Sequence, residues 1–181
     1  MSYYDVDAIL TESQKLPCTF QLDVPGLGYL DGSPGETITA GTKIELPLWL
    51  GTMLAVANSN NPSQSALVTL DFPAPLQTRV INALEADPKS VDIRAQAPHY
   101  YALGSKILEL FEDDQIVEVL LKTFRQRAAE IADHAHNPRG ALGEGQEFLR
   151  GLDEMERQLF KAAHEGPKAV RQWLIDMKRI S

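Results

Sequence analysis

Histidine and cysteine, the residues that most often hold metals, are sparse and poorly spaced in this sequence. His134 and His136 lie two residues apart near the end of a predicted helix, so their side chains point in nearly opposite directions. Cys18 is the only cysteine, which excludes an intramolecular disulfide and a thiolate metal cluster within the chain. It alternates with Phe20 and Leu22, a pattern typical of a packed thiol. We therefore predict solvated histidines, no metal site and no cysteine nucleophile.

One pair of carboxylates has the spacing of an acid/base catalyst. Asp153 and Glu156 are three residues apart and share a helix face. Arg150 and Arg157 lie close enough in sequence to pair with them. We interpret the group as an ion-pair surface, and predict no catalytic residue here.

Glycine-rich nucleotide motifs are incomplete. Gly26-Leu27-Gly28 begins like a dinucleotide-binding loop, but Asp31 occupies the position of the third glycine and no helix follows to receive a phosphate. The sequence contains no Gly-Lys-Ser/Thr phosphate loop and no Gly-x-Ser-x-Gly elbow. Residues 26–28 are therefore read as a turn, and no cofactor is expected.

Composition narrows the class of protein further. The 181 residues include 17 Lys and Arg against 25 Asp and Glu, a formal charge of -8, which argues against binding nucleic acid by electrostatics alone. No stretch approaches the ~20 apolar residues of a membrane-spanning helix, and the first residues do not resemble a signal peptide. We expect a soluble, intracellular protein.

The elements that would carry these residues change character along the chain. Alternating strands and short helices come first: a helix from Asp5 that ends before Leu16-Pro17, then segments 18–22, 42–46, 47–57 and 66–72. Residues 58–62 are predicted to be a loop. Pro73 and Pro75 interrupt the hydrogen bonding of both helices and strands. Beyond them the period becomes helical, over 76–84, 98–110, 117–131 after a cap at Asp113 or Asp114, 149–159 and 170–177. Gly166-Pro167 is expected to separate the last two helices.

The predicted fold class is therefore α+β, mainly α, with a small β-rich domain over 1–73 followed by a helical bundle domain over 74–181. At the corner between the strand 42–46 and the next helix, Leu48 and Trp49 add more apolar surface than one helix stripe needs. We expect both to be exposed and to dock onto another surface.

Four segments in this order resemble one known family. They are Val6 to Leu10 with Lys15-Leu16-Pro17, Lys43-Ile44-Glu45-Leu46-Pro47-Leu48-Trp49-Leu50, Pro98-His99-Tyr100-Tyr101-Ala102-Leu103-Gly104-Ser105, and Leu152-Asp153-Glu154-Met155-Glu156-Arg157-Gln158-Leu159-Phe160. Together they are similar to the Psf-three subunits of the GINS DNA replication complex. The Leu-Pro-Leu-Trp-Leu stretch also resembles the sibling Psf-two subunits. Residues 58–65 and 133–144 match no pattern of the family.

The resemblance implies a non-catalytic structural role in the nucleus. GINS is a heterotetramer of four related subunits, and in that family it joins the MCM ring and the CDC forty-five coactivator to form the active replicative helicase. It also helps to connect polymerase epsilon. The implied partners are thus three other GINS subunits and, through the complex, the helicase and the polymerase.

Six apolar residues are candidates for subunit contacts. Adjacent apolar positions widen the helix stripes beyond one face, which is typical of surfaces that an assembly buries. The candidates are Leu48, Trp49, Phe111, Leu121, Phe148 and Phe160.

Two other classes of protein remain open from the sequence. A small stand-alone enzyme would use His99, Tyr100 and Asp92 in a cleft and behave as a monomer. A DNA-binding module would need a basic face, which this acidic chain does not show.

Overall fold

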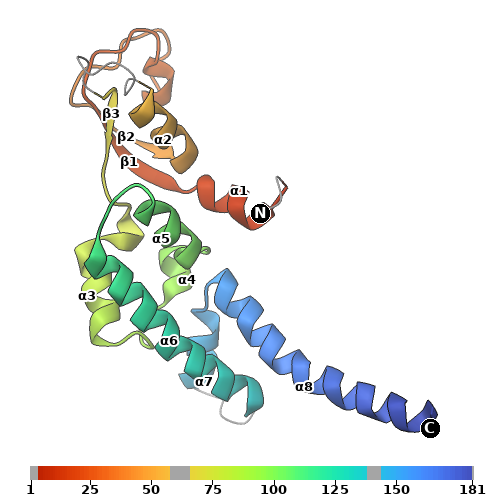
Figure 1. Cartoon of the computed structure of the whole chain (residues 1–181). Coiled ribbons are helices and arrows are strands. Elements are labelled where there is room, and N and C mark those ends of the chain that lie inside the picture. Colours follow the sequence, from red (N-terminus) through yellow and green to blue (C-terminus); the bar gives the residue numbers. More distant parts are fainter. Residues whose placement is uncertain (1–3, 58–65, 138–143, 181) are drawn as a thin grey trace. The chain divides into compact units, whose positions relative to one another are not determined.

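The computed structural model describes residues 4–57, 66–137 and 144–180, coloured along the chain in Figure 1. The chain divides into two compact units, residues 1–77 and 78–181. The loop predicted at 58–62 lies outside the described residues, as do residues 138–143 of the unmatched segment 133–144. Each unit is described separately below.

The first unit is built on a three-stranded antiparallel sheet. The central strand β1 (Lys15–Phe20) pairs with β2 (Lys43–Pro47) on one side and β3 (Val68–Leu70) on the other. Cys18 lies opposite Ile44 in β2 and Leu70 in β3. A helix, α1 (Val6–Glu12), precedes the sheet, and the side chain of Asp5 caps its first turn. This small sheet followed by helices confirms the predicted α+β, mainly α class.

Strand β1 begins earlier than predicted and contains a proline. The expected helix up to Leu16 ends at Glu12 instead, and Pro17 lies inside the central strand. The Pro17 carbonyl accepts a hydrogen bond from the Asp71 amide at 2.9 Å. In an antiparallel ladder the N–H and C=O of one residue face the same neighbour, so the missing N–H faces the end of β3 at Leu70. The proline therefore costs the ladder little.

The core of the first unit is one face of the sheet covered by α2 (Leu48–Val56). Leu16, Cys18 and Phe20 alternate along β1 and are all buried, as a period of two requires. Gly51 lets α2 approach closely, because a Cβ there would lie 3.0 Å from the Cys18 sulfur. The interpretation of Cys18 as a packed thiol is confirmed.

Cys18 should react with thiol reagents only after unfolding. Burial raises the pKa of its thiol to about 11 from an ordinary value near 9, and the thiolate is the nucleophile. At pH 8 we expect native Cys18 to react with a disulfide reagent at least about 100-fold more slowly than in the urea-unfolded chain, a ratio set by the two pKa values. Stopped-flow absorbance measures both rates. Equal rates would show that the thiol is accessible in the native state.

The corner after β2 differs from the prediction at Leu48. Leu48 is only 3 % exposed, so it belongs to the core, while its neighbour Trp49 is 50 % exposed. Pro47 is both the last residue of β2 and the N-cap of α2, and the amide of Leu48 donates to the carbonyl of Gln14 at 2.8 Å. That bond ties the start of α2 to the residue just before β1, and the Leu48 side chain is buried. The expected exposure of Leu48 is wrong, and Trp49 is the exposed residue of the pair.

The second unit is a bundle of helices. Its described elements are α3 (Thr78–Ala86), α4 (Ile93–Gln96), α5 (Tyr100–Leu108), α6 (Asp114–His136), α7 (Glu144–Arg150) and α8 (Glu154–Ile180). Side chains of Asp92 and Asp113 cap α4 and α6 by accepting from the amides of Ala95 and Ile116. The longest helices, α6 and α8, pack against each other. A short 3₁₀ turn, Ala74–Leu76, leads from β3 towards the bundle.

The last helices break at a different place than predicted. The sequence favours one helix through 149–159 and a stop at Gly166-Pro167, but α7 ends at Arg150 and α8 runs through Pro167 without interruption. Gly151 packs against Asp92, where a Cβ would lie 3.3 Å from its backbone, and the next helix starts anew from Asp153. Tertiary packing at Gly151 therefore marks the break between α7 and α8, and Pro167 is accommodated inside α8.

Among the described helices, none combines the length and the apolar character that crossing a membrane requires.

Candidate functional site

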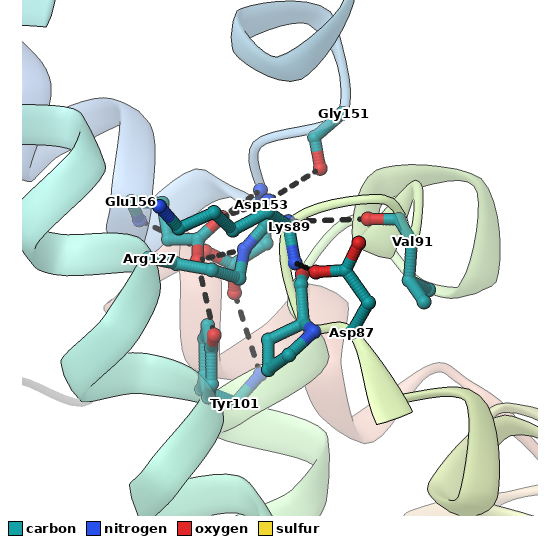
Figure 2. Close-up of polar contacts among 9 residues, drawn as sticks. Asp87, Lys89, Val91, Tyr101, Arg127, Gly151, Asp153 and Glu156 are labelled. Carbon is teal, nitrogen blue, oxygen red and sulfur yellow. Dashed lines mark hydrogen bonds and ion pairs between the residues drawn. The ribbon is translucent and has the colours of Figure 1, made fainter. Parts of the chain in front are cut away.

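Arg127, on α6 of the helical unit, is fully buried, with 0 % of its surface exposed. Its Nε and Nη2 donate to the two carboxylate oxygens of Glu156 at 2.7 and 2.9 Å, and Nη1 donates to the carbonyls of Pro88 and Val91 at 2.9 and 3.1 Å. Nη2 also donates to the Gly151 carbonyl at 3.3 Å, as Figure 2 shows. These five hydrogen bonds use the full donor capacity of a guanidinium group.

Glu156 receives further support from the start of α8. The Glu156 amide donates to Asp153 Oδ1 at 2.8 Å, and the Asp153 amide donates to Glu156 Oε2 at 3.3 Å. This reciprocal pattern is a capping box with aspartate at the N-cap. The hydroxyl of Tyr101 in α5 donates to Glu156 Oε1 at 3.0 Å, and the Tyr101 amide donates to Asp153 Oδ2 (Figure 2).

Burial is the largest cause of the pKa shifts of Asp153 and Tyr101 in this network. It raises the pKa of Asp153, and the nearby Glu156 charge acts in the same direction, while amide hydrogen bonds from Glu156 and Tyr101 oppose the shift. Burial followed by the Glu156 charge also raises the pKa of the Tyr101 phenol. The charges are paired and enclosed, so the network fixes helices in place and offers no exposed acid or base.

The predicted ion-pair surface at Asp153 and Glu156 is therefore wrong in two respects. Both carboxylates are buried, and the cation that pairs with Glu156 is Arg127 on α6 instead of Arg150 or Arg157. A sequence signal existed, because Arg127 lies on the same helix face as the apolar residues of α6 that point inward. A lone arginine on an apolar stripe indicates a buried partner.

An open cavity of about 800 Å³ lies beside this network. Lys89 and Glu130 form an ion pair on its wall, and His134 Nε2 lies 3.3 Å from the other Glu130 oxygen. The hydrogen bond to Glu130 raises the pKa of Lys89, and the same bond lowers that of Glu130. His134 is buried against the Phe148 ring, so the predicted solvation of this histidine is wrong, whereas His136 is exposed.

In the part of the chain that the structure describes, no group of three or more His, Cys, Asp and Glu residues is placed to hold a metal ion. The residues of the alternative enzyme site have other surroundings. Tyr100 is buried and edge-on to Tyr101, and Asp92 caps α4. His99 is buried as the N-cap of α5.

The remaining candidate interface residues differ in exposure. Leu121 on α6 is 52 % exposed, whereas Phe111, Phe148 and Phe160 are half-buried. The Phe148 ring covers the Arg127 guanidinium at 4.7 Å, so Phe148 supports the fold of its own unit. Phe160 stacks on His164, with 6.0 Å between ring centroids. Trp49 and Leu121 are thus the candidates whose side chains are most available to a partner.

Comparison with known proteins decides the family. Residues 4–56 match the family model described as the PSF3 N-terminal domain, and residues 75–175 match the GINS complex protein helical bundle domain. The chain belongs to the Psf3 family of GINS proteins. The N-terminal match does not favour the Psf-two alternative.

Similar Psf3 proteins cover the whole chain. The DNA replication complex GINS protein psf3 of Aspergillus fumigatus is 62 % identical over 179 residues, which is 99 % of each chain. That of Phaeosphaeria nodorum is 63 % identical over 178 residues, 98 % of each chain. That of Schizosaccharomyces pombe is 40 % identical over 173 residues, 96 % of this chain and 97 % of the relative.

Both of the matched Psf3 domains contain candidate residues. Trp49 falls within the PSF3 N-terminal domain, and Leu121 and the Arg127 network fall within the GINS helical bundle domain. The network joins α5, α6 and α8 with the segments around Val91 and Gly151. It therefore sets the arrangement of the helices that carry the exposed residues.

Proposed function

We propose that this chain is a non-catalytic structural subunit of the GINS complex in DNA replication, acting by presenting surfaces to other proteins. Its Psf3 relatives carry that complex in their names, and its family models cover both units. The observation that carries the proposal is exposed apolar surface. Large apolar side chains stand exposed on α1, α2, α6 and the second half of α8, more than scattered single residues would give.

The immediate partners in this proposal are the three other GINS subunits, in a heterotetramer. Trp49 and Leu121 are proposed contact residues, with Phe111 and Phe160 at the edges of the contacts. Leu48 and Phe148 support the fold and are not proposed to touch a partner. Leu48 fills the core of the first unit, and Phe148 covers Arg127. No metal, cofactor or catalytic residue takes part.

In the finer proposal the assembled complex works in the nucleus. There it joins the MCM ring and the CDC forty-five coactivator to form the replicative helicase and connects to polymerase epsilon. The support is the family membership together with the chain's charge of -8, which favours protein partners over direct binding of nucleic acid. We also place the domain boundary at Pro73, giving domains 1–73 and 74–181, because the helical bundle match begins at residue 75.

Trp49→Ala tests the role of the first domain. Exposed tryptophans are frequent anchors of interfaces, so we expect the substitution to weaken either the tetramer or its binding to MCM and CDC forty-five by about 10-fold or more. Size-exclusion chromatography and pull-down with the reconstituted complex measure both. Tyr29→Ala is the matched control, since Tyr29 is similarly exposed but lies outside α2. If Trp49→Ala behaved like the control in both assays, this docking role would be wrong.

A further inference from the structure

The second half of α8 has an uncovered apolar face. Glu156, Ala163 and Val170 are spaced by seven residues and therefore lie along one stripe of the helix. They are buried, half-buried and exposed, in that order. α6 covers the first part of the stripe as far as His164, whose Nδ1 lies 3.2 Å from the Ala135 carbonyl. α6 ends one residue later, and Figure 1 shows α8 continuing beyond it.

The uncovered part of the stripe is rich in large side chains. Trp173 is 58 % exposed, and Val170 and Leu174 lie beside it at helical spacing. This is the same face that α6 buries earlier along α8. A partner that continues this packing would present an apolar helical groove, as in the binding of an amphipathic helix to a protein surface.

The charge of this segment is opposite to that of the chain. Residues 166–181 contain four cationic residues and one acidic residue, a net charge of +3 within a chain of -8. Arg171 lies three residues before Leu174 and so borders the stripe on one edge. A basic edge beside an apolar stripe complements a groove whose rim carries carboxylates.

We propose that residues 166–178 of α8 bind an apolar groove with an acidic rim on another subunit of the GINS complex. Trp173 is the anchor, and Arg171 selects the acidic rim. This proposal rests on the proposed function for its partner, and adds the segment and the chemistry of the surface that receives it. Nucleic acid fits less well, because the face that is left uncovered is apolar.

The helical structure of this segment should depend on its partner. Gly166 and Pro167 lie inside α8, and both disfavour helix relative to Ala. The part of α8 beyond them is about as long as the shortest helices that are even marginally stable alone in water. Its backbone amides should therefore exchange quickly when the face is uncovered, and slowly when a partner covers it.

The test uses the full chain co-purified with the three other GINS subunits. Hydrogen exchange followed by mass spectrometry reports on peptides from 166–178 in the assembled complex. We expect these amides to exchange at least about 100-fold more slowly than unstructured peptide, as for a helix in a buried interface. Trp173→Ala and Arg171→Glu should each remove most of this protection, and should speed dissociation of the subunit about 10-fold or more.

Matched controls separate this effect from general damage. Arg125→Glu makes the same charge change at an exposed position of α6, and Tyr29→Ala removes an equally exposed ring from the first unit. Both should leave the protection of 166–178 and the dissociation rate unchanged. Circular dichroism of each complex checks that the variants stay folded.

The possible results separate a failure of this inference from a failure of the proposed function. A complex that forms while 166–178 exchanges freely would overturn this inference and leave the proposed function standing. Failure of the wild-type chain to form any complex would overturn the proposed function itself. Should Arg171→Glu leave the complex unaffected but abolish its binding to a 30-base-pair duplex or to phosphatidylserine vesicles, the segment would serve nucleic acid or membrane, and the inference would be wrong.

Discussion

Replacing Arg127 with methionine is expected to lower the free energy of unfolding of the helical unit by about 3 to 5 kcal/mol. The substitution leaves the Glu156 carboxylate buried without its cation, and removes the donors that satisfy the carbonyls of Pro88, Val91 and Gly151. Natural domains have only about 5 to 15 kcal/mol of stability, so the substitution should remove a large fraction of the stability of the unit. Urea denaturation followed by circular dichroism at 222 nm measures the loss.

Arg125→Met is the control for this experiment. Arg125 lies two residues away on α6 and is exposed, so its replacement should change stability by less than about 0.5 kcal/mol. Similar effects of the two substitutions would show that the buried network does not hold the bundle together.

A double variant separates the buried charge from the other bonds. Arg127→Met with Glu156→Leu removes both charges, so the penalty of an unpaired carboxylate disappears. The carbonyls around Arg127 and the hydroxyl of Tyr101 still lose their partners, and so does the amide of Asp153. We therefore expect recovery of part of the stability lost in Arg127→Met, measured by the same denaturation.

Replacing Leu121 with arginine should disrupt assembly without disturbing the fold. Leu121 is exposed and lies four residues after the partly exposed Val117, so both belong to one outward face of α6. A charge placed in a packed apolar contact finds no partner, which costs about 2 kcal/mol or more and weakens assembly roughly 30-fold. Co-purification with the three other subunits measures the loss.

Gln126→Arg provides the comparison for Leu121→Arg. Gln126 is exposed on the same helix but on a different face, and its replacement by arginine introduces the same charge. Its complex should form normally, and both variants should keep the wild-type melting temperature. Normal assembly of Leu121→Arg would remove this face of α6 from the proposed contacts.

Much of the fold could be predicted because it depends on local patterns. Alternation at Cys18 and Phe20 predicted β1, and the helical period after Asp114 predicted α6. The resemblance placed the chain in the right family through four segments, two within each of the matched family models. These features lie within a few residues of each other, where single-sequence reasoning is strongest.

The errors at the candidate site and at the corner after β2 involve contacts between distant parts of the sequence. Arg127 and Glu156 are 29 residues apart, so neighbouring arginines looked like the better partners of Glu156. The break at Gly151 depends on its close packing against Asp92, and the burial of Leu48 depends on a bond from its amide to Gln14. Periodicity cannot reveal such contacts, because they are set by tertiary packing.

Native mass spectrometry of the chain co-expressed with three other GINS subunits tests the central claim most directly. A structural subunit predicts one species containing one copy of each of the four chains, together with poor solubility of this chain when it is expressed alone. A well-behaved 20.0 kDa monomer that joins no complex in the presence of the three partners would contradict the account.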